Sequence, residues 1–462
     1  MIQIDNMVGN PPFQDRQSRG KTQHKLWIDF TKTAIDELLK PNGQIGWLTP
    51  SSFSSPSNKI LDYFKKHSTN YINFDTNDYF DDENNSVGIN MAHYVIRKND
   101  DILKATKVVS NTNEFLVNLN NDLFYIPNDI SDESISIHQK TFLSKNDKYP
   151  IYYDYVTCHN VLLNRIKVDC PISKEKTSKH IYPIFHTNSQ TWYSSVEQMC
   201  YSKKKVMWTR SGFQKPFYNN GNLGMTDMAY CIFVDTDEIG ENLAHNLNQK
   251  LFQYLFKTAK WSGFGNEKVF RLIPTLPNRQ MPDSEIYEYF GITNKEQQYI
   301  DDILNNNIEQ IKTNIKPILN TTPYEDYARQ HYMAGLTRSQ TRINNTAEVF
   351  TPTNCVQDIL NHMDESSFRN NETFLDNSCG DGQFLVEVVI KKQQMGITLE
   401  NALKTTYGVD IMPDNIEICR KRLQGPNPTK EIINIVNQNI VCSDSLEYDY
   451  SFGQPVGVES FF

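Results

Sequence analysis

A short apolar run near the start of the chain ends in two consecutive prolines, and this arrangement restricts the local fold more than any other stretch. The run from residue 2 to residue 9 indicates a β-strand, and residues 11 and 12 are both proline. Proline has no amide hydrogen for a β-ladder and fixes its own φ angle, so the strand must end there. We therefore expect the side chains that come directly after this strand to lie at the carboxyl edge of a sheet, where open α/β proteins bind ligands.

The four residues at this point are Asn10, Pro11, Pro12 and Phe13. An asparagine amide, a proline carbonyl and an aromatic ring together suit a flat group that carries an amino function. A lone motif of four residues is equally compatible with a turn that buries a phenylalanine, so the motif needs support from the rest of the chain.

Helix and strand patterns alternate after this motif. Helical spacing of apolar residues predicts helices over 26–39 and 58–66, and short apolar runs predict strands over 44–48, 71–74 and 88–97. Such alternation is typical of a mostly parallel sheet covered by helices.

Three predicted strands in the C-terminal part end in residues that suit a nucleotide-like cofactor. Residues 373–385 form an apolar strand, a glycine turn and the start of a helix, a pattern that lets a ligand approach the backbone. The strand over 407–411 ends near Asp410, an acid placed to accept both hydroxyls of a ribose. A third strand, over 439–446, also ends in an acid. A glycine loop alone is a weak signal, but three such strand ends together with the N-terminal motif are a much stronger one.

Residues 8–13 resemble the catalytic motif of the amino-group DNA methyltransferases, which methylate adenine N6 with S-adenosylmethionine. Residues 347–352, 373–385, 407–411 and 439–446 resemble the cofactor motifs of the same family, with Asn377 where the family more often has proline. The resemblance implies that Asn10, Pro11, Pro12 and Phe13 are catalytic, with Phe13 stacking on a flipped-out adenine and Tyr79 or Phe80 on its other face. It implies that S-adenosylmethionine is bound by Phe350, Thr351, Pro352, Asp376, Ser378, Gly380, Gly382, Asp410, Ile411, Asp444, Ser445 and Leu446.

The order of these motifs resembles the permuted β group of the family. The implied fold is α/β: a Rossmann-like class I methyltransferase sheet with helices on both faces, assembled from both ends of the chain, plus an α+β target-recognition domain. We expect a catalytic half over 1–105, the recognition domain over 106–282, a helical linker over 283–340, the cofactor-binding half over 341–455 and a tail over 456–462. Within the helical part, Thr293 and Glu296 have the spacing of a capping box.

The formal net charge of −9 hides a basic middle segment. Residues 151–280 contain 16 Lys and Arg against 10 Asp and Glu. Basic residues alternate with Trp and Tyr over 203–210 and 215–218, a pattern that suits contact with phosphates and bases. An α+β domain in which these aromatic residues are ordinary core residues explains the same pattern, and a solvated face explains the modest basic excess. Residues 261–270, followed by two prolines, resemble the closing segment of target-recognition domains.

Composition excludes several other classes of protein. No apolar run approaches the length of a membrane span, and the chain does not open on a secretory signal pattern. Eight cysteines without a CxxC spacing argue against a zinc site or a disulfide framework and suit the reducing cytoplasm of a bacterial or phage-infected cell.

These patterns predict a site-specific DNA adenine-N6 methyltransferase. Its expected partner is double-stranded DNA, and a separate restriction endonuclease is a candidate partner. No PD-x-ExK-like nuclease pattern is present, so we do not expect this chain to cleave DNA. Methylation of a protein glutamine at N5, methylation of RNA adenine, and a non-catalytic DNA-binding role remain alternatives. The long segment between the two halves disfavours glutamine methylation, and intact acids at Asp376, Asp410 and Asp444 disfavour a degenerate fold.

Overall fold

The first strand, β1 (Ile4–Gly9), pairs with strands from opposite ends of the chain. It is parallel to β2 (Leu39–Pro50) on one side and to β17 (Phe374–Asp376) on the other. Met7 lies opposite Ile45 in β2 and opposite Leu375 in β17. The N-terminal and C-terminal parts of the chain therefore build one sheet, as expected from the sequence.

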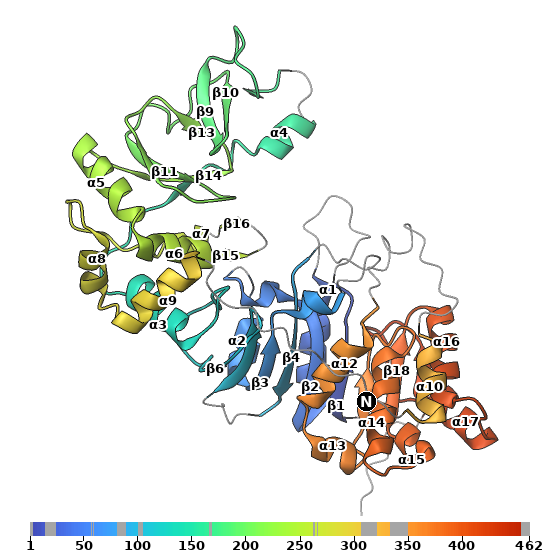
Figure 1. Ribbon diagram of the computed structural model, residues 1–462. Helices are drawn as coiled ribbons and strands as arrows, with labels where there is room; N and C mark the ends of the chain where they lie inside the picture. The colour runs from blue at the N-terminus through green and yellow to red at the C-terminus, as the bar shows by residue number, and fades with distance from the viewer. Residues whose placement is uncertain are drawn as a thin grey trace, which may run out of the picture. The chain divides into compact units, whose positions relative to one another are not determined.

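The computed structural model describes residues 3–13, 25–56, 58, 60–80, 89–99, 105–165, 169–261, 264–265, 267–305, 321–332 and 350–453. The chain divides into two compact units (Figure 1). The sheet unit consists of residues 1–52, 60–120 and 311–462, and the insert unit consists of residues 53–59 and 121–310. The expected segment 347–349 and the tail 456–462 lie outside the described residues.

Among the described residues of the sheet unit, nine strands form one sheet in the order β19-β18-β17-β1-β2-β4-β3-β5-β6. The strands from β19 to β2 are parallel, and β4 is antiparallel to both of its neighbours, as expected for the strand over 88–97. The carboxyl ends of β1, β17, β18 and β19 consequently share one edge. The remaining strands are β3 (Ser68–Asn73), β4 (Met91–Arg97), β5 (Thr106–Ser110), β6 (Asn113–Val117), β18 (Thr406–Asp410) and β19 (Ile440–Cys442).

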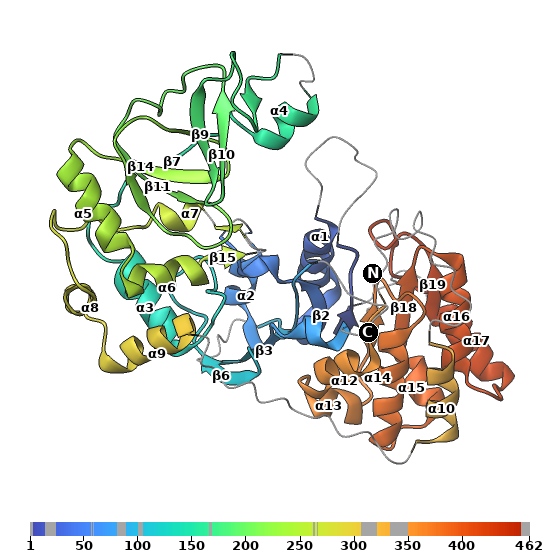
Figure 2. The ribbon, with the colours of Figure 1, turned by 45° about the horizontal axis from the view of Figure 1, so that its top comes forward.

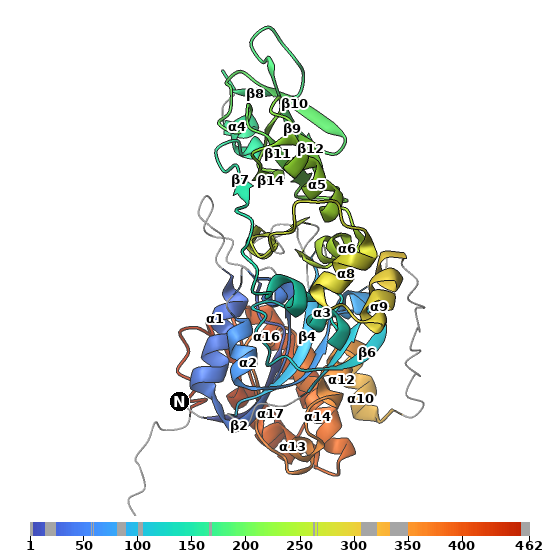
Figure 3. The ribbon, with the colours of Figure 1, turned by 90° about the vertical axis from the view of Figure 1, so that its left-hand side faces the viewer.

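Helices cover both faces of this sheet (Figure 3). Tyr94 of β4 packs on one face against Phe64, with ring centroids 4.7 Å apart. Gly46 of β2 faces the opposite way, where a Cβ atom would lie 2.7 Å from Ile359 Cγ2. The helical elements are α1 (Leu26–Thr33), η1 (Ala34–Leu38), η2 (Ser51–Ser54), α2 (Leu61–Lys66), η3 (Thr76–Phe80), α10 (Pro323–Gln330), α12 (Thr353–Asn361), α13 (Glu365–Arg369), α14 (Gln383–Gln394), α15 (Leu399–Lys404), α16 (Pro413–Gln424) and α17 (Lys430–Asn439). None of the helices in the described part of the chain is long and apolar enough to cross a membrane.

Three element boundaries in the sheet unit differ from those expected. The helix expected over 26–39 is formed by α1 and the π-helical turn η1, which follows it directly and ends at Leu38. Strand β2 begins earlier than expected, at Leu39, because that residue already pairs with Ile4; a register shift and a positive φ at Asn42 absorb the extra residues. The sheet unit continues to Asn120, beyond the boundary expected at residue 105, because β5 pairs with β3 and β6 with β5. Helix α10, expected in a linker over 283–340, packs into the core around α14 and α16.

The insert unit is a mixture of small sheets and helices. Its described strands form two four-stranded sheets, β13-β9-β10-β8 and β12-β11-β14-β7, and the hairpin β15-β16. These strands are β7 (Tyr152–Tyr153), β8 (Ile172–Ser173), β9 (Tyr182–Thr187), β10 (Gln190–Ser194), β11 (Lys205–Thr209), β12 (Phe217–Asn219), β13 (Gly224–Met225), β14 (Ala229–Phe233), β15 (Lys260–Trp261) and β16 (Phe264–Gly265). The helices are α3 (Asp132–Phe142), α4 (His159–Arg165), α5 (Asp237–Leu247), α6 (Lys250–Thr258), α7 (Glu267–Phe270), α8 (Asp283–Phe290) and α9 (Asn294–Asn305).

Helix α9 begins at the capping box that the sequence predicts. The Thr293 amide donates to Glu296 Oε2 (2.7 Å), and the Glu296 amide donates to Thr293 Oγ1 (3.3 Å). Helices α8 and α9 belong to the insert unit. Residues 306–320 and 333–340 of the helical linker expected over 283–340 lie outside the described residues.

Gly46 tests how closely α12 must approach the sheet. We expect Gly46→Ala to lower stability by about 1–3 kcal/mol, because the new Cβ atom would overlap Ile359 and force α12 outward. Differential scanning calorimetry measures the change as a lower unfolding temperature. Glu114→Ala, at an exposed position of β6, serves as the control, with an expected change within about 0.5 kcal/mol. Equal unfolding temperatures for Gly46→Ala and the wild type would contradict the close approach.

Candidate active site

Asn10 follows directly after β1 and is held by two other segments of the sheet unit. Its side-chain Nδ2 donates to Thr351 Oγ1 (3.2 Å), and Ser378 Oγ donates to its main-chain oxygen (3.3 Å). The three residues come from β1, from the stretch before α12 and from the loop after β17. The structure thus brings together three residues that the sequence assigns to one site. Pro11 and Phe13, next to Asn10, are both buried.

Asp376 lies directly against Gly9 at the same edge of the sheet. A Cβ atom on residue 9 would be only 2.6 Å from Asp376 Oδ1, so glycine at this position leaves room for the Asp376 carboxylate against the backbone. The Ser378 amide donates to the carboxylate (3.0 Å). Complete burial raises the pKa of Asp376 to about 8; the Ser378 hydrogen bond opposes the shift and the nearby charge of Asp410 adds to it.

The glycine loop is tied to the end of β18. The Gly380 amide donates to Asp410 Oδ2 (2.9 Å), while Oδ1 of the same carboxylate accepts from the Met412 amide (2.8 Å). Gly380 has a φ of +52°, and nothing lies within 4 Å of the position a Cβ atom would take. Gly382 has a φ of +87°, and a Cβ atom there would meet Cys419 Sγ at 2.6 Å. The two glycines therefore differ: Gly380 borders open space, whereas Gly382, at the start of α14, is needed for packing against Cys419 of α16.

Two large apolar side chains are exposed just after β18 and β19, which lie side by side (Figure 2). Ile411 is 59% exposed and Leu446 is 46% exposed. The acid expected at the end of the third strand, Asp444, lies two residues beyond β19 and is exposed, with Oδ1 accepting from the Leu446 amide (2.9 Å). The hydroxyl of buried Ser445 donates to the main-chain oxygen of Asn377, so Ser445 anchors this turn to the loop after β17.

The stretch that precedes α12 contains the remaining predicted residues. Phe350 is buried, and Pro352 is the N-cap residue of α12. Tyr332, from the turn after α10, donates its hydroxyl to the main-chain oxygen of Thr351 (3.0 Å) and packs edge-on against Phe350. Thr351 is thereby held through its main chain while its side chain contacts Asn10.

No motif in the sequence marks Tyr332 or Arg422 as part of this site. Arg422 is fully buried in α16, donates to Gln383 Oε1 (2.7 Å) and pairs with Asp381. Its guanidinium carbon lies 5.7 Å from the centre of the Tyr332 ring. Tyr332 falls in a stretch expected to be a linker, and Arg422 follows Arg420 and Lys421 on an amphipathic helix. No sequence signal therefore distinguishes either residue from surface residues.

The two aromatic residues considered for base stacking besides Phe13 have other contacts. Phe80 is buried in the core. Tyr79 hydrogen-bonds to Asp358 and packs edge-on against His93, and burial raises the pKa of its hydroxyl. A stacking role for either residue remains a prediction.

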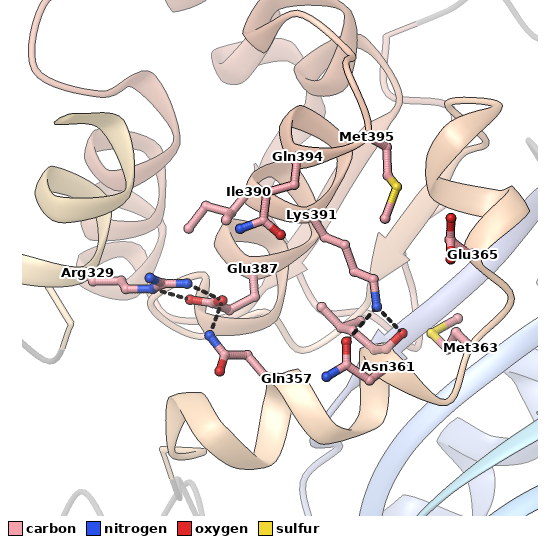
Figure 4. Close-up of a pocket in the computed structure, with 11 residues that line it drawn as sticks. Arg329, Gln357, Asn361, Met363, Glu365, Glu387, Ile390, Lys391, Gln394 and Met395 are labelled. Atoms are coloured by element: carbon pink, nitrogen blue, oxygen red, sulfur yellow. Dashed lines mark hydrogen bonds and ion pairs between the residues drawn. The ribbon is translucent and has the colours of Figure 1, made fainter. Parts of the chain in front are cut away.

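A cavity of about 410 Å³ lies between α10, α12 and α14 (Figure 4). Its charged groups pair with neighbouring residues: Glu387 accepts from Arg329 (2.9 and 2.8 Å) and from Gln357 (3.0 Å). Lys391 donates to the carbonyl of Leu360 (2.7 Å) at the end of α12. These bonds tie α10 and α12 to α14 and so support the segments that carry Tyr332 and Thr351.

Comparison with known proteins places the first part of the chain near one family. Residues 2–85 match the sequence model of the Eco57I restriction-modification methylase family, which supports a methyltransferase of a restriction-modification system. A search of curated proteins finds no match.

Solved structures with detectable similarity include the type IIL restriction-modification enzyme MmeI in complex with DNA, at 8% identity and a TM-score of 0.30. The DrdV–DNA complex is 11% identical with a TM-score of 0.33, and the type IIG restriction endonuclease BpuSI is 11% identical with a TM-score of 0.21. The matches cover 85%, 73% and 74% of this chain respectively, but only 57%, 48% and 50% of those chains. The chain thus spans about half the length of the structures it matches.

The raised pKa of Asp376 predicts a pH-dependent stability. The folded-state value of about 8 lies above the ordinary value of 3.8, so the folded protein binds an extra proton between these two pH values. This extra proton stabilises the folded protein. The stabilisation is complete below pH 3.8 and is lost as pH rises through about 8. Asp376→Asn mimics the neutral acid and still accepts from Ser378. We therefore expect the wild-type unfolding temperature to fall more steeply than that of Asp376→Asn between about pH 6 and about pH 9, as measured by differential scanning fluorimetry. Parallel pH curves for the two proteins would refute the raised pKa.

Proposed function

We propose that this protein is a site-specific DNA adenine-N6 methyltransferase that uses S-adenosylmethionine. We further propose that it acts in restriction-modification or in the protection of host or phage DNA. The observation that carries this proposal is the position of Asn10, whose amide and carbonyl are held by Thr351 and Ser378 beside the glycine loop. The restriction-modification methylase match over residues 2–85 supports the same conclusion.

The residues at the carboxyl edge of the sheet fit the proposed cofactor. Exposed Ile411 and Leu446 suit the two faces of an adenine ring, and exposed Asp444 suits its amino group. Asp410 retains acceptor capacity for ribose hydroxyls, since a carboxylate offers about four lone-pair sites. The open space at Gly380 allows a ligand to approach the backbone. We assign contacts with the methionine part to Phe350, Thr351, Pro352, Asp376, Ser378 and Gly382. The cofactor supplies a methyl group on a positively charged sulfonium.

The proposed role of Asn10 is to position the amino group of the target adenine. This nitrogen is a poor nucleophile because its lone pair is delocalised into the ring. Asn10 Oδ1 and the main-chain oxygen of Pro11 would accept its two hydrogens and align the lone pair for methyl transfer. The hydrogen bond from Asn10 Nδ2 to Thr351 sets which way the amide faces and so gives Oδ1 the acceptor role; because Oδ1 is buried in this structure, neighbouring groups would have to move as the base enters. Catalysis of this kind depends on position and oriented dipoles.

The base must leave the duplex to reach such a site. Phe13 is the proposed stacking partner. Because Phe13 is buried in this structure, stacking would require its ring to expose one face as the base enters.

The decisive experiment is transfer of labelled methyl from S-adenosylmethionine to unmethylated duplex DNA, followed by nucleoside analysis. We expect label in N6-methyladenine and a rate at least about 100-fold lower for Asn10→Ala, with cofactor affinity unchanged. Asn437→Ala, at an exposed position of α17, serves as the control and should retain full activity. Label in protein or RNA but not in DNA would overturn the proposed acceptor.

The contact between Thr351 and Asn10 predicts a separation of turnover from binding. Thr351→Val removes the acceptor for Asn10 Nδ2, so the amide loses its fixed orientation and kcat should fall about tenfold, with a smaller change in the KM for cofactor. Thr351→Ser should restore most of the rate. Tyr332→Phe should lower kcat in the same way, by releasing the main chain of Thr351.

The matched control for Tyr332→Phe is Tyr324→Phe. Tyr324 lies on α10 and donates its hydroxyl to the main-chain oxygen of Leu423 (3.2 Å), away from Asn10. Steady-state kinetics in which Thr351→Val and Tyr332→Phe lose cofactor affinity but keep kcat, while Tyr324→Phe matches the wild type, would show that Thr351 binds cofactor without orienting Asn10.

A further inference from the structure

Several loops of the insert unit meet at one end of its two small sheets, close to β7, β11 and β14 (Figure 2). We define the loop cluster as residues 154–159, 188–189, 210–215 and 226–228. The Arg210 amide donates to the Met228 carbonyl (2.7 Å), and the Asp227 amide donates to the Thr157 carbonyl (3.2 Å). The side-chain amide of Asn188 donates to the carbonyl of Phe213. These bonds join the loops into one surface.

Three large side chains stand exposed on this surface. Tyr155 is 63% exposed, Val156 is 86% exposed and Phe213 is 68% exposed. Exposed apolar groups in such a small region are uncommon unless the surface meets a partner.

The loops that carry these side chains are anchored by hydrogen bonds. Asp154 Oδ1 accepts from the Val156 amide (2.9 Å), and Asp154 Oδ2 accepts from the Thr157 hydroxyl (2.7 Å). Gly212 precedes Phe213 with a φ of +69°, and its carbonyl accepts from Lys260. The exposed side chains are therefore presented on loops of defined shape, so binding would cost little ordering of the chain.

The charged groups of the loop cluster favour a polyanion. Both of its carboxylates are buried: Asp154 accepts from the Val156 amide in its own loop, and Asp227 accepts from the His159 amide in the neighbouring segment of the cluster. Lys215 is exposed, and Arg210 lies over the Tyr153 ring with its guanidinium carbon 5.2 Å from the ring centre. The charges that reach solvent here are therefore positive.

Residues 203–209, which hold most of the basic and aromatic stretch, are a poor candidate for the same role; only Arg210, at the end of that stretch, belongs to the loop cluster. Most of the stretch is strand β11, and all five residues of β11 are buried. The Lys205 ammonium donates to the Lys203 carbonyl (2.9 Å), and Trp208 stacks on Phe256 in the core. The alternative explanation of this stretch as a core strand is confirmed, and among its lysines only Lys203 is exposed while Lys204 is half-buried.

We propose that the loop cluster is the surface by which this protein contacts duplex DNA, with Phe213 and Val156 inserted between base steps. This inference rests on the proposed function, which makes DNA the substrate. Apolar side chains of this kind can wedge between base pairs and kink the duplex. Arg210, Lys215 and Lys260 bind the flanking phosphates, which supplies affinity and sets the register.

Fluorescence anisotropy with labelled duplex DNA of random sequence tests the wedge. The Phe213→Ala/Val156→Ser double variant should bind at least about tenfold more weakly than the wild type, since one stacked contact is worth about that factor. Leu116→Ala is the matched control, because Leu116 is also 68% exposed but lies on β6 of the sheet unit. Its affinity for DNA should equal that of the wild type.

The salt dependence of binding tests the phosphate contacts. Lys215→Ala should reduce the slope of log affinity against log salt by about one, whereas Lys421→Ala, on exposed α16 surface, should not change it. Calorimetry with S-adenosylmethionine checks that every variant binds cofactor as the wild type does.

The outcomes separate this inference from the proposed function. Suppose that the wild type methylates DNA and that the Phe213→Ala/Val156→Ser and Lys215→Ala variants bind DNA as tightly as the wild type. This result would overturn the loop cluster as the DNA surface and leave the proposed function intact. Binding of single-stranded RNA in preference to duplex DNA by the wild type would overturn both. Weaker DNA binding in the loop variants alone, with unchanged cofactor affinity, supports the inference.

Discussion

The parallel pairing of β1 with β17 is the interaction on which the rest of the sheet unit depends. It joins strands whose paired residues lie 368 positions apart in the chain, and it places Asn10 beside the loop that follows Asp376. Glycine at residue 9 leaves room for the Asp376 carboxylate against the backbone at the end of β1. The same contact buries a carboxyl group with the pKa of about 8 that follows from its desolvation. Asn10, Asp376 and Ser378 therefore share a single strand-to-strand junction, and the candidates Asp410 and Asp444 follow the next two strands along the same edge.

Support for this junction comes from residues behind it. Arg422 donates to Asp381 and Gln383 at the glycine loop and to the main chain of α10, the helix that precedes Tyr332. Tyr332 in turn holds the main chain of Thr351, whose side chain contacts Asn10. A fully buried arginine is costly unless its donors are satisfied, and here they meet main-chain and side-chain oxygens. This arrangement gives Asn10 a fixed orientation, which positional catalysis requires.

The insert unit shows that a basic and aromatic sequence pattern need not lie at the surface. Residues 151–280 contain 16 Lys and Arg against 10 Asp and Glu, an excess consistent with a polyanionic partner. Strand β11, which has the strongest basic and aromatic pattern, packs into the core because its partners β12 and β14 lie on either side and α6 supplies Phe256. The exposed apolar side chains Tyr155, Val156 and Phe213 instead lie on loops whose sequences have no marked pattern.

The sequence alone determined the elements whose signals are local. Two prolines end β1, Gly380 and Gly382 form a turn, Pro413 begins α16, and Thr293 with Glu296 begins α9, because each depends on the backbone preferences of adjacent residues. Resemblance to a family's motif order added the expectation that both ends of the chain share one sheet. Only the tertiary structure decided that β5 and β6 extend that sheet, that α10 belongs to its core, and that Tyr332 and Arg422 support Asn10. These features depend on contacts between residues far apart in the chain, and the pattern within one segment does not specify which distant surface will bury it.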